Sequence, residues 1–571
     1  MTKFSFSIAT MALMATMTGC VIEKSTAVLI TDITINPVGD VFVEMGRTVT
    51  LTATVTPPEA SSENIIWSTY HTYIATIDAQ TGVVTGVNMG TATIRASATD
   101  KSGVTAEKNV TVSFFSQGNG TQENPYVITT PAQMDAVRDR LHAHYKLGNN
   151  INLTSYLAAG GTGYVKWGNA GWEPIGRNSA TPFTGSFDGA GYKITGLWEN
   201  RPSFGSSIYN GGLFGCIENA TIKNLGVDIS NAQGGIKGFG FVGGIVGLAI
   251  GNSKIDNCYT NGAVSLPEGG SVGGVVGEIW KGGSITNCYA TGTVSGNGGS
   301  VGGVVGAVSN IDDTKSSIVN CYAMGNVICT NGAGGSSVGG VAGRVSHCDI
   351  TNCFATGNIT CTITALLSFD YSCGSSVGGL VGWMVGWNNS HITDCFATGN
   401  ISSSITCSDN GLSHSSHAGG IAGVIDNVSM TNCYATGTVA SAINVSGAEY
   451  RGESCAGGIA ADFYRGSMTN CVALNPSVKT TGYSYPYAGT GRVIGYTYDA
   501  TLHNNWGRNN TIVTQNNVSK TLIKGSNQVD GADCIAIPAQ SWWTTAAPNG
   551  PEWSTTVWTF TIDPMPKLQQ Q

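Results

Sequence analysis

Short runs of alternating polar and apolar residues fill the first part of the chain, between residues 28 and 114. Val49–Val55 and Thr91–Ala96 are two such runs, and the turn-forming pairs Pro57-Pro58 and Thr81-Gly82 lie among them. An alternation with period two is typical of strands that bury one face. Several short strands at this spacing favour a small β-sandwich. The segment holds no cysteine, so we expect its apolar core to form without a disulfide.

A different pattern begins near residue 211 and recurs eight times. One half of it has the form Val-Gly-Gly-x-x-Gly, as in Val272–Gly277, and the other half reads Ile-x-Asn-Cys-(Tyr/Phe)-Ala-x-Gly. Leu225 fills the cysteine slot in the first repeat, and seven cysteines fill it afterwards: Cys258, Cys288, Cys321, Cys353, Cys395, Cys433 and Cys471. Successive slots are 30 to 42 residues apart. Such a period is typical of solenoids, propellers and repeat arrays.

Among these architectures the repeat favours a solenoid. Each repeat holds too few strand-like runs for a four-stranded propeller blade, and it shows no helical period. One repeat cannot bury its apolar residues alone, but coils stacked about 4.8 Å apart can. We therefore predict an all-β chain, in which the N-terminal β-sandwich is followed by a right-handed parallel β-solenoid (β-helix) with a short capping helix.

The cysteines of the repeat are expected inside the solenoid. A slot that leucine and cysteine share is apolar, so we interpret the seven thiols as a buried, unreactive stack. Cys329 and Cys361, each eight residues after a repeat cysteine, are expected to form a second short stack. The sequence leaves undecided whether the cysteines outside these slots form disulfides: Cys216, Cys348, Cys373, Cys407, Cys455 and Cys534. No C-x-x-C pair supports a zinc ribbon.

An asparagine precedes the slot in most repeats. Side-chain amides can hydrogen-bond from one rung to the next, so we predict a ladder at one corner of the solenoid. Its members are Asn224, Asn257, Asn287, Asn320, Asn352, Asn432 and Asn470. Asp394 interrupts the ladder, and because a carboxylate cannot donate a hydrogen bond, we expect this rung to be wetter or locally distorted.

The N-terminus has the features of an export signal. Lys3 is followed by an apolar stretch, Phe4–Met17, which is too short to span a membrane. Met17-Thr18-Gly19-Cys20 resembles the lipobox of bacterial lipoproteins, which implies cleavage before Cys20 and a lipid on its thiol. Ordinary signal cleavage beside an incidental cysteine is the alternative. The lipid would bind the chain to a membrane, so we expect an exported outer-membrane lipoprotein at the cell surface.

The solenoid needs caps, because its end coils would otherwise expose strand edges. Thr130-Pro131-Ala132-Gln133 has the pattern of a helix start and predicts a single helix over the first coil. Five of the twelve tryptophans follow the repeats and predict an aromatic cap on the last coil, with sugar stacking as the alternative: Trp506, Trp542, Trp543, Trp553 and Trp558. The expected order is a lipoprotein signal peptide (1–20), a tether (21–27), the sandwich (28–114), N-terminal coils and cap (120–210), repeats (211–475) and a C-terminal aromatic-rich cap (476–571).

Two parts of the chain resemble known families. Trp67-Ser68, Ala75–Asp78 and Gly82–Val87 resemble the bacterial immunoglobulin-like group 2 domain, whose members are mostly stalks or binding modules. The repeats and the block before them, about residues 120–475, resemble the GLUG-motif repeats of bacterial surface proteins. This resemblance implies a cell-surface or secreted β-solenoid, often found in adhesins, with no shared set of catalytic residues.

The composition offers little other chemistry. The net charge is −8 and the sequence has no run of basic residues, so we expect no basic surface that could bind nucleic acid. No acidic position recurs in two successive repeats, whereas lyases and glycosidases need converging carboxylates. Asp312-Asp313, His347-Cys348 and the His414/His417 pair are therefore expected to be solvated or structural. We expect no catalytic residue, no metal and no cofactor.

These observations favour a non-catalytic, membrane-anchored surface lipoprotein that displays its solenoid for adhesion or for binding an extracellular glycan, a host protein or a neighbouring surface protein. Three long loops, at residues 361–376, 402–417 and 440–454, follow the same half of successive repeats and are the expected recognition surface. The alternatives are a carbohydrate-active β-helix enzyme (a polysaccharide lyase or glycosidase) and a passive structural component of a surface assembly.

Overall fold

The computed structural model describes residues 28–569 except 61–63, 116, 204–209, 311–313, 331–334, 366–372, 409–412, 447–450, 483–488, 536–537 and 561–564. The signal segment with Cys20, the tether and the Asp312-Asp313 pair lie outside the described residues. The chain divides into two compact units, residues 1–114 and 115–571.

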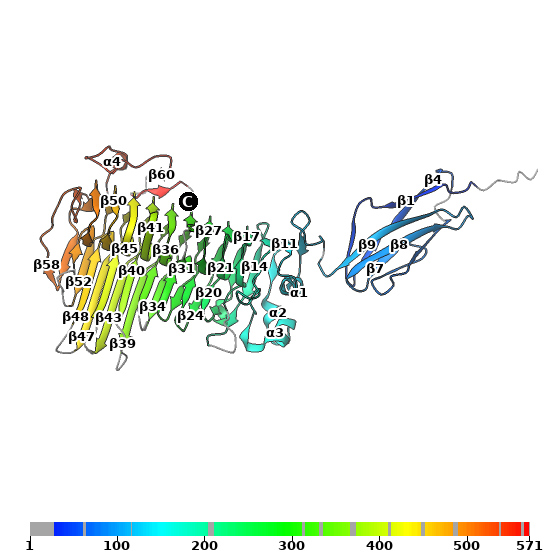
Figure 1. Cartoon of the computed structure of the whole chain (residues 1–571), viewed down its shortest axis with the longest axis horizontal. Helices are drawn as coiled ribbons and strands as arrows, with labels where there is room; N and C mark the ends of the chain where they lie inside the picture. The colour runs from blue at the N-terminus through cyan, green and yellow to red at the C-terminus, as the bar shows by residue number, and fades with distance from the viewer. Residues whose placement is uncertain are drawn as a thin grey trace, which may run out of the picture. The chain divides into compact units, whose positions relative to one another are not determined.

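The first unit is an immunoglobulin-like β-sandwich, as the alternating pattern predicted. Its described strands form sheets in the orders β1-β4, β2-β9-β8-β5 and β3-β7-β6 around a core that includes Trp67, Ile94 and Val110 (Figure 1). The strands are β1 (Asp32–Asn36), β2 (Val41–Glu44), β3 (Thr48–Thr50), β4 (Thr52–Thr56), β5 (Ile65–Thr69), β6 (Ala75–Ile77), β7 (Val83–Gly86), β8 (Gly90–Ala98) and β9 (Thr105–Ser113).

The second unit is a parallel β-solenoid, which confirms the predicted fold class. Each coil, followed from its cysteine slot, adds strands to four sheets in turn. Within the described residues these sheets hold 12, 11, 8 and 19 strands, and we call them the first to the fourth sheet in that order. The fourth sheet receives two strands from most coils. Figure 1 shows the strands stacked side by side along the unit.

The strands of the first sheet are β12 (Ile151–Asn152), β14 (Lys193–Leu197), β18 (Gly226–Ile229), β23 (Tyr259–Asn261), β28 (Tyr289–Ala290), β33 (Tyr322–Ala323), β38 (Phe354–Ala355), β42 (Phe396–Ala397), β46 (Tyr434–Ala435), β51 (Val472–Ala473), β56 (Trp506–Arg508) and β59 (Ala532–Cys534). Those of the second sheet are β15 (Glu199–Asn200), β19 (Ile236–Lys237), β24 (Val264–Leu266), β29 (Val294–Gly296), β34 (Val327–Thr330), β39 (Ile359–Ala365), β43 (Ile401–Ser408), β47 (Val439–Ser446), β52 (Ser477–Thr481), β57 (Ile512–Gln515) and β58 (Val518–Ser519).

The strands of the third sheet are β20 (Phe241–Gly243), β25 (Ser271–Gly273), β30 (Gly299–Gly302), β35 (Ser336–Gly339), β40 (Gly374–Gly378), β44 (Ser413–Gly419), β48 (Arg451–Gly457) and β53 (Thr490–Gly491). Those of the fourth sheet are β10 (Tyr126–Ile128), β11 (His144–Leu147), β13 (Ser186–Asp188), β16 (Phe214–Glu218), β17 (Thr221–Lys223), β21 (Val246–Ile250), β22 (Lys254–Asp256), β26 (Val276–Trp280), β27 (Gly283–Thr286), β31 (Val305–Ser309), β32 (Ser316–Val319), β36 (Ala342–Ser346), β37 (Cys348–Thr351), β41 (Val381–Thr393), β45 (Ala422–Thr431), β49 (Ala460–Tyr464), β50 (Ser467–Thr469), β54 (Ile494–Tyr498) and β55 (Thr501–His503).

Equivalent residues of successive coils lie directly above one another. Val272 pairs with Val301, and Val301 pairs with Val338, so an interior column repeats similar residues from coil to coil. The glycines of the repeat allow this close stacking. A Cβ added at Gly277 would come within 2.5 Å of the carbonyl oxygen of Gly247, so only glycine fits where this turn of one coil meets the next.

The slot residues form a buried interior column, with Leu225 at 0% exposure and the seven repeat cysteines at 0 or 1%. All fifteen cysteines in the described part of the chain are buried and outside any disulfide, including those for which the sequence left a disulfide open. Each slot thiol donates to the backbone carbonyl two residues before it, as Cys321 does to Val319 at 3.2 Å, and this holds the sulfurs in one repeated orientation. Burial raises the pKa of the Cys288, Cys353 and Cys433 thiols well above the usual value, so they are protonated.

The asparagines before the slot form the predicted ladder. Their backbone conformation gives a second reason for asparagine at this position, which the sequence did not reveal. Every ladder asparagine has a φ between 50 and 56°, the left-handed conformation that asparagine tolerates better than most residues. The amide of Asn320 donates to Asn287 at 3.0 Å, and Asn352 donates to Asn320 at 3.2 Å. Asn257 donates to Asn224 at 2.8 Å, but Asn287 donates to Asp256 instead of Asn257. The asparagine therefore both forms the corner and links it to the next coil.

The expectation of a wetter rung at Asp394 is wrong. Asp394 keeps the left-handed φ of 54° and is only 9% exposed. Its Oδ1 accepts hydrogen bonds from the amide of Asn432 at 2.9 Å and from the indole of Trp558 at 3.1 Å, so a C-terminal side chain takes the place of water. Since the carboxylate cannot donate, the buried Oδ1 of Asn352 accepts no hydrogen bond from the described residues.

The N-terminal end of the solenoid carries several short helices instead of one. Thr130 caps α1 (Pro131–Asp135) by accepting from the backbone of Gln133, and the chain then tightens into η2 (Ala136–Asp139). The predicted start is therefore right, but the α-helix lasts little more than one turn. Further helices that the sequence did not predict are α2 (Thr154–Leu157), α3 (Thr162–Trp167), η3 (Gly168–Ala170) and η4 (Asn231–Gln233).

The C-terminal tryptophans cover a side of the solenoid, which corrects the prediction of an end cap. Rings of the first sheet stack from coil to coil, and those of Tyr322 and Phe354 are 4.6 Å apart. The segment with α4 (Gln540–Trp543), β60 (Trp558–Thr559) and β61 (Lys567–Leu568) packs on this ring column at Phe396 and Tyr434. Figure 1 shows α4 and β60 along one side of the solenoid.

The last coil is covered by residues 516–534 instead. There β58 turns back antiparallel to β57, and β59 pairs with β56. The guanidinium of Arg492, buried completely, donates to Asp533 at 2.5 Å and to the backbone of Asp530 at 2.7 Å. These paired charges satisfy the polar groups at this end of the core.

Restoring the asparagine at the interrupted rung tests the ladder. In the D394N variant the new amide can donate to Asn352, while its oxygen keeps the bonds from Asn432 and Trp558. We expect an increase of about 1 kcal/mol in the free energy of unfolding, measured by denaturant titration. D499N is the matched control, because Asp499 also has a left-handed φ, of 53°, but is exposed. A D394N protein less stable than the wild type would contradict the ladder's role.

Candidate functional site

A groove runs along the border between the third and the fourth sheet. Its third-sheet side is a column of hydroxyls, in which Ser300, Ser337 and Ser376 pair coil to coil. The fourth-sheet side is a second column, in which Arg344 pairs with Trp383. Together these residues line a hollow of about 360 Å³. Each serine precedes an inward-facing valine, so the period-two alternation of the strand turns the serine outward.

The two columns are linked by a constant spacing in the sequence. A third-sheet residue and the fourth-sheet residue beside it are always seven positions apart, as Ser337 and Arg344 are. The Val-Gly-Gly-x-x-Gly segment between them makes the corner. Every repeat therefore contributes one pair of side chains to this border.

Arg344 and Trp383 give the middle of the groove its chemistry. The Arg344 guanidinium lies 4.5 Å from the centre of the Trp383 ring, a cation–π arrangement that positions the charge. Arg344 is exposed, and Trp383 is half-buried. A fixed guanidinium beside rows of hydroxyls is suited to bind a carboxylate or sulfate group on a polyhydroxylated ligand.

The border carries an acid towards the N-terminal end of the solenoid. Glu278 is 7% exposed, and its carboxylate accepts from the hydroxyl of Ser271 at 2.6 Å and from the indole of Trp280 at 2.5 Å. The Trp280 ring meets Phe241 edge to face, with ring centres 5.3 Å apart. Both oxygens of Glu278 are thus bound within the protein.

In the other direction the same columns lead to a buried ionic cluster. His417 follows Ser376 in the third-sheet column, and Asp462 follows Val424 in the fourth-sheet column. The imidazole Nε2 of His417 lies 3.1 Å from Asp462 and 3.5 Å from Glu453. Burial by itself would lower the pKa of His417, but the two carboxylates raise it to about 10. The imidazole is therefore charged at neutral pH and balances part of the acidic charge.

The structure corrects two expectations and narrows a third. His414 and His417 are buried, at 3 and 6% exposure, so of the two predicted alternatives, solvated or structural, the solvated one is excluded. The described parts of the presumed long loops are largely strand, because the inserted residues lengthen strands such as β43 and β44 of the second and third sheets. Residues 366–372, 409–412 and 447–450 of these segments lie outside the described residues. The absence of a recurring acid did not exclude converging acids, since Glu453 and Asp462 come from adjacent strands of one coil. The available signal was the seven-residue spacing of Cys455 and Asp462, which places both at this border.

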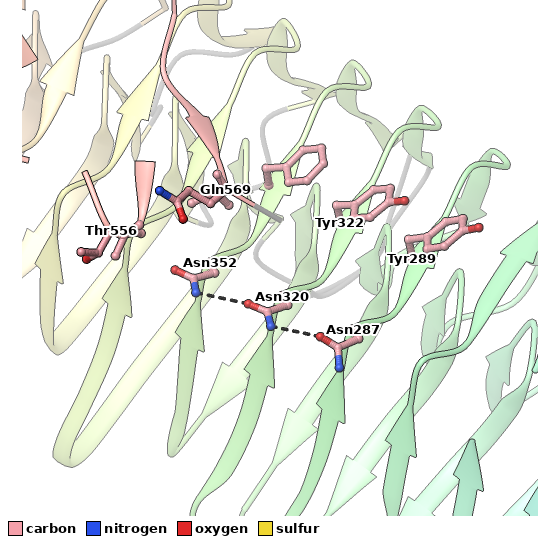
Figure 2. A pocket seen from close by; sticks show the side chains of 10 residues that line it. Asn287, Tyr289, Asn320, Tyr322, Asn352, Thr556 and Gln569 are labelled. Carbon is pink, nitrogen blue, oxygen red and sulfur yellow. Dashed lines mark hydrogen bonds between the residues drawn. The ribbon is translucent and has the colours of Figure 1, made fainter. Parts of the chain in front are cut away.

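The predicted ladder residues border a second, smaller hollow of about 280 Å³. Figure 2 shows Asn287, Asn320 and Asn352 along one side of it and the rings of Tyr289 and Tyr322 along another. The C-terminal segment closes it at Thr556 and Gln569. The rings here lie face to face, with those of Tyr289 and Tyr322 4.8 Å apart. Their faces are therefore occupied by one another and do not offer a stacking platform to a sugar.

Comparisons with protein families fit this architecture. The model of the bacterial Ig-like domain (group 2) matches residues 29–117, and the model of the GLUG motif matches residues 268–295, 334–360 and 374–402. The chain therefore contains a bacterial Ig-like domain and GLUG-motif repeats. Both resemblances seen in the sequence are confirmed.

Individual relatives match only parts of the chain. A "Putative Gly-rich membrane protein" of Evansella cellulosilytica is 47% identical over 116 residues, which are 20% of this chain and 12% of that protein. Halomucin of Haloquadratum walsbyi is 34% identical over 151 residues, 26% of this chain and 2% of halomucin. An α-L-arabinofuranosidase of Bifidobacterium longum is 53% identical over 62 residues, 11% of this chain and 6% of the enzyme. The chain thus spans a small fraction of each relative's length.

One solved structure covers most of the chain. It is a crystal structure described as a "putative immunoglobulin A1 protease" from Bacteroides ovatus, 19% identical, covering 80% of this chain and 96% of that one with a TM-score of 0.36. At this level the likeness carries no argument about activity. No helix in the described part of the chain is long and apolar enough to cross a membrane.

Proposed function

We propose that this chain is a non-catalytic surface lipoprotein, anchored through Cys20, that binds an acidic glycan in the groove between the third and fourth sheets. The observation that carries the proposal is the Arg344 guanidinium held on the Trp383 ring beside the serine column. Arginine is well suited to grip a carboxylate or sulfate group, because its planar fork can donate two hydrogen bonds at once.

The repetition of the groove favours a polymer over a small ligand. Serine hydroxyls recur once per coil, at about 4.8 Å, along Ser300, Ser337 and Ser376. An extended polysaccharide lying along the axis would meet the same donor and acceptor at each coil. Apart from Arg344, Trp383 and Val424, the hollow is lined by glycine and serine, whose small side chains leave room for an extended chain.

The surface location is supported by the sequence signal and the domain content. The lipobox-like run ends at Cys20, and a lipid there would hold the chain at a membrane. The Ig-like domain follows as a spacer before the solenoid. This groove replaces the three presumed loops as the proposed recognition surface, because much of their length is strand.

Binding to a glycan array tests the proposal with the full chain. We expect acidic glycans to bind, and we expect R344A and W383A each to weaken binding at least tenfold, since a charged hydrogen bond contributes about 1.5–3 kcal/mol. R465A is the matched control, because Arg465 is also exposed and pairs with Asp426, and neither residue lines the groove. Unchanged binding by R344A and W383A would contradict the proposed site.

A carbohydrate-active enzyme is the second candidate, favoured by the acids around His417. Oxygens of Glu453 and Asp462 lie 3.5 and 3.1 Å from the same imidazole nitrogen, and a pair of neighbouring carboxyl groups is what glycosidases need. The proposal of a binding protein expects no cleavage across a polysaccharide panel. Cleavage by the wild type that E453Q abolishes would establish the enzyme instead, because the Glu453 side chain is 34% exposed and accessible.

A further inference from the structure

Three side chains of different chemistry converge beside the C-terminal part of the groove. His417 in β44 pairs in register with Cys455 in β48, and Asp462 lies in β49 of the same coil as Cys455. One ligand atom from each of the three lies within 4.8 Å of the other two. Glu453 adds a carboxylate oxygen 3.5 Å from Nε2 of His417.

Hydrogen bonding within the protein does not account for this cluster. The His417 and Asp462 side chains are only 7 and 4% exposed. Nε2 of His417 and Oδ1 of Asp462 are buried, and neither makes a hydrogen bond to the described residues. Buried polar atoms are nearly always partnered, so two unpartnered atoms in one cluster call for a ligand.

We propose that His417, Cys455, Asp462 and Glu453 form a binding site for a zinc ion. An imidazole, a thiolate and carboxylates are the ligands that zinc takes, and the sulfur disfavours calcium and magnesium. Zinc–ligand bonds of about 2.0–2.3 Å in a tetrahedron separate the ligand atoms by roughly 3.5 Å. The separations of 3.1 and 3.5 Å around Nε2 already match that spacing.

Neighbouring groups support the ligands from outside. The hydroxyl of Tyr464 donates to Asp462 at 2.9 Å, and the backbone amide of Gly489 donates to the sulfur of Cys455 at 3.3 Å. Such outer hydrogen bonds orient metal ligands in proteins. Three strands of the rigid solenoid hold the set, so little reorganisation is needed for binding.

Zinc takes a neutral imidazole and a thiolate as ligands, so a proton on the ligand nitrogen of His417 and the thiol proton of Cys455 go to solvent when the ion binds. With four protein ligands the site is closed, as structural zinc sites are, and would fasten β44 to β48 and β49.

Metal titration of the full chain tests this inference, which is independent of the glycan proposal. The chain is first stripped of metal with a chelator and then given zinc. We expect it to take up one zinc ion per chain, measured by elemental analysis, and we expect its melting temperature to rise. Cobalt substituted for zinc should give visible bands of a tetrahedral site with a thiolate-to-cobalt transition.

Variants separate this site from incidental binding. We expect C455S and H417Q to bind zinc at least tenfold more weakly and C455S to lose the thiolate transition. H391Q is the matched control, because His391 also lies 3.1 Å from an aspartate, Asp349, but its side chain is 45% exposed and it does not belong to the cluster. Circular dichroism verifies folding of each variant. A wild-type chain without stoichiometric zinc, or wild-type affinity in both C455S and H417Q, would overturn the proposal.

Discussion

The solenoid depends on one constraint, the in-register stacking of each coil on the next. Backbone hydrogen bonds run from coil to coil, so a residue can only lie above its equivalent in the neighbouring repeat. The corner residues enforce this register. An asparagine such as Asn320 turns the backbone through the left-handed region, and its amide then reaches the same corner of the adjacent coil. Every column on the surface follows from that alignment.

The columns explain how chemistry arises in a chain with few charges. No single repeat carries a binding site. Arg344 and Trp383 come from successive coils, and so do His417 and Cys455. The effect of a substitution in one repeat therefore depends on the residue at the equivalent position one coil away. The same rule applies to the aromatic column, which has tyrosine at Tyr289 and Tyr322, and phenylalanine at Phe354 and Phe396, where the C-terminal segment packs on it. A tyrosine under that cover, Tyr434, has its hydroxyl bonded to the carbonyl of Pro566.

The stacked coils and their interior columns were largely predictable from the sequence, because aligning the repeats with one another shows which residues are equivalent. The exchange of Leu225 for cysteine marks an apolar slot, and the fold class follows from the period. The groove was missed because residues seven apart become neighbours only when the glycine-rich corner is folded. Asp394 was misjudged because its partner, Trp558, is 164 residues away in the chain. The strand extensions were missed because serine-rich segments look like loops, although the second and third sheets supply partners for them.

The central claim is that stacked repeats form a groove whose guanidinium and hydroxyl column bind an acidic polysaccharide. A crystal structure of the full chain with a bound acidic oligosaccharide tests it most directly. The account expects the oligosaccharide to lie along the border of the third and fourth sheets, with its anionic group on Arg344. An oligosaccharide bound elsewhere, on the Ig-like domain or against the half-buried tyrosines of the first sheet, would contradict it.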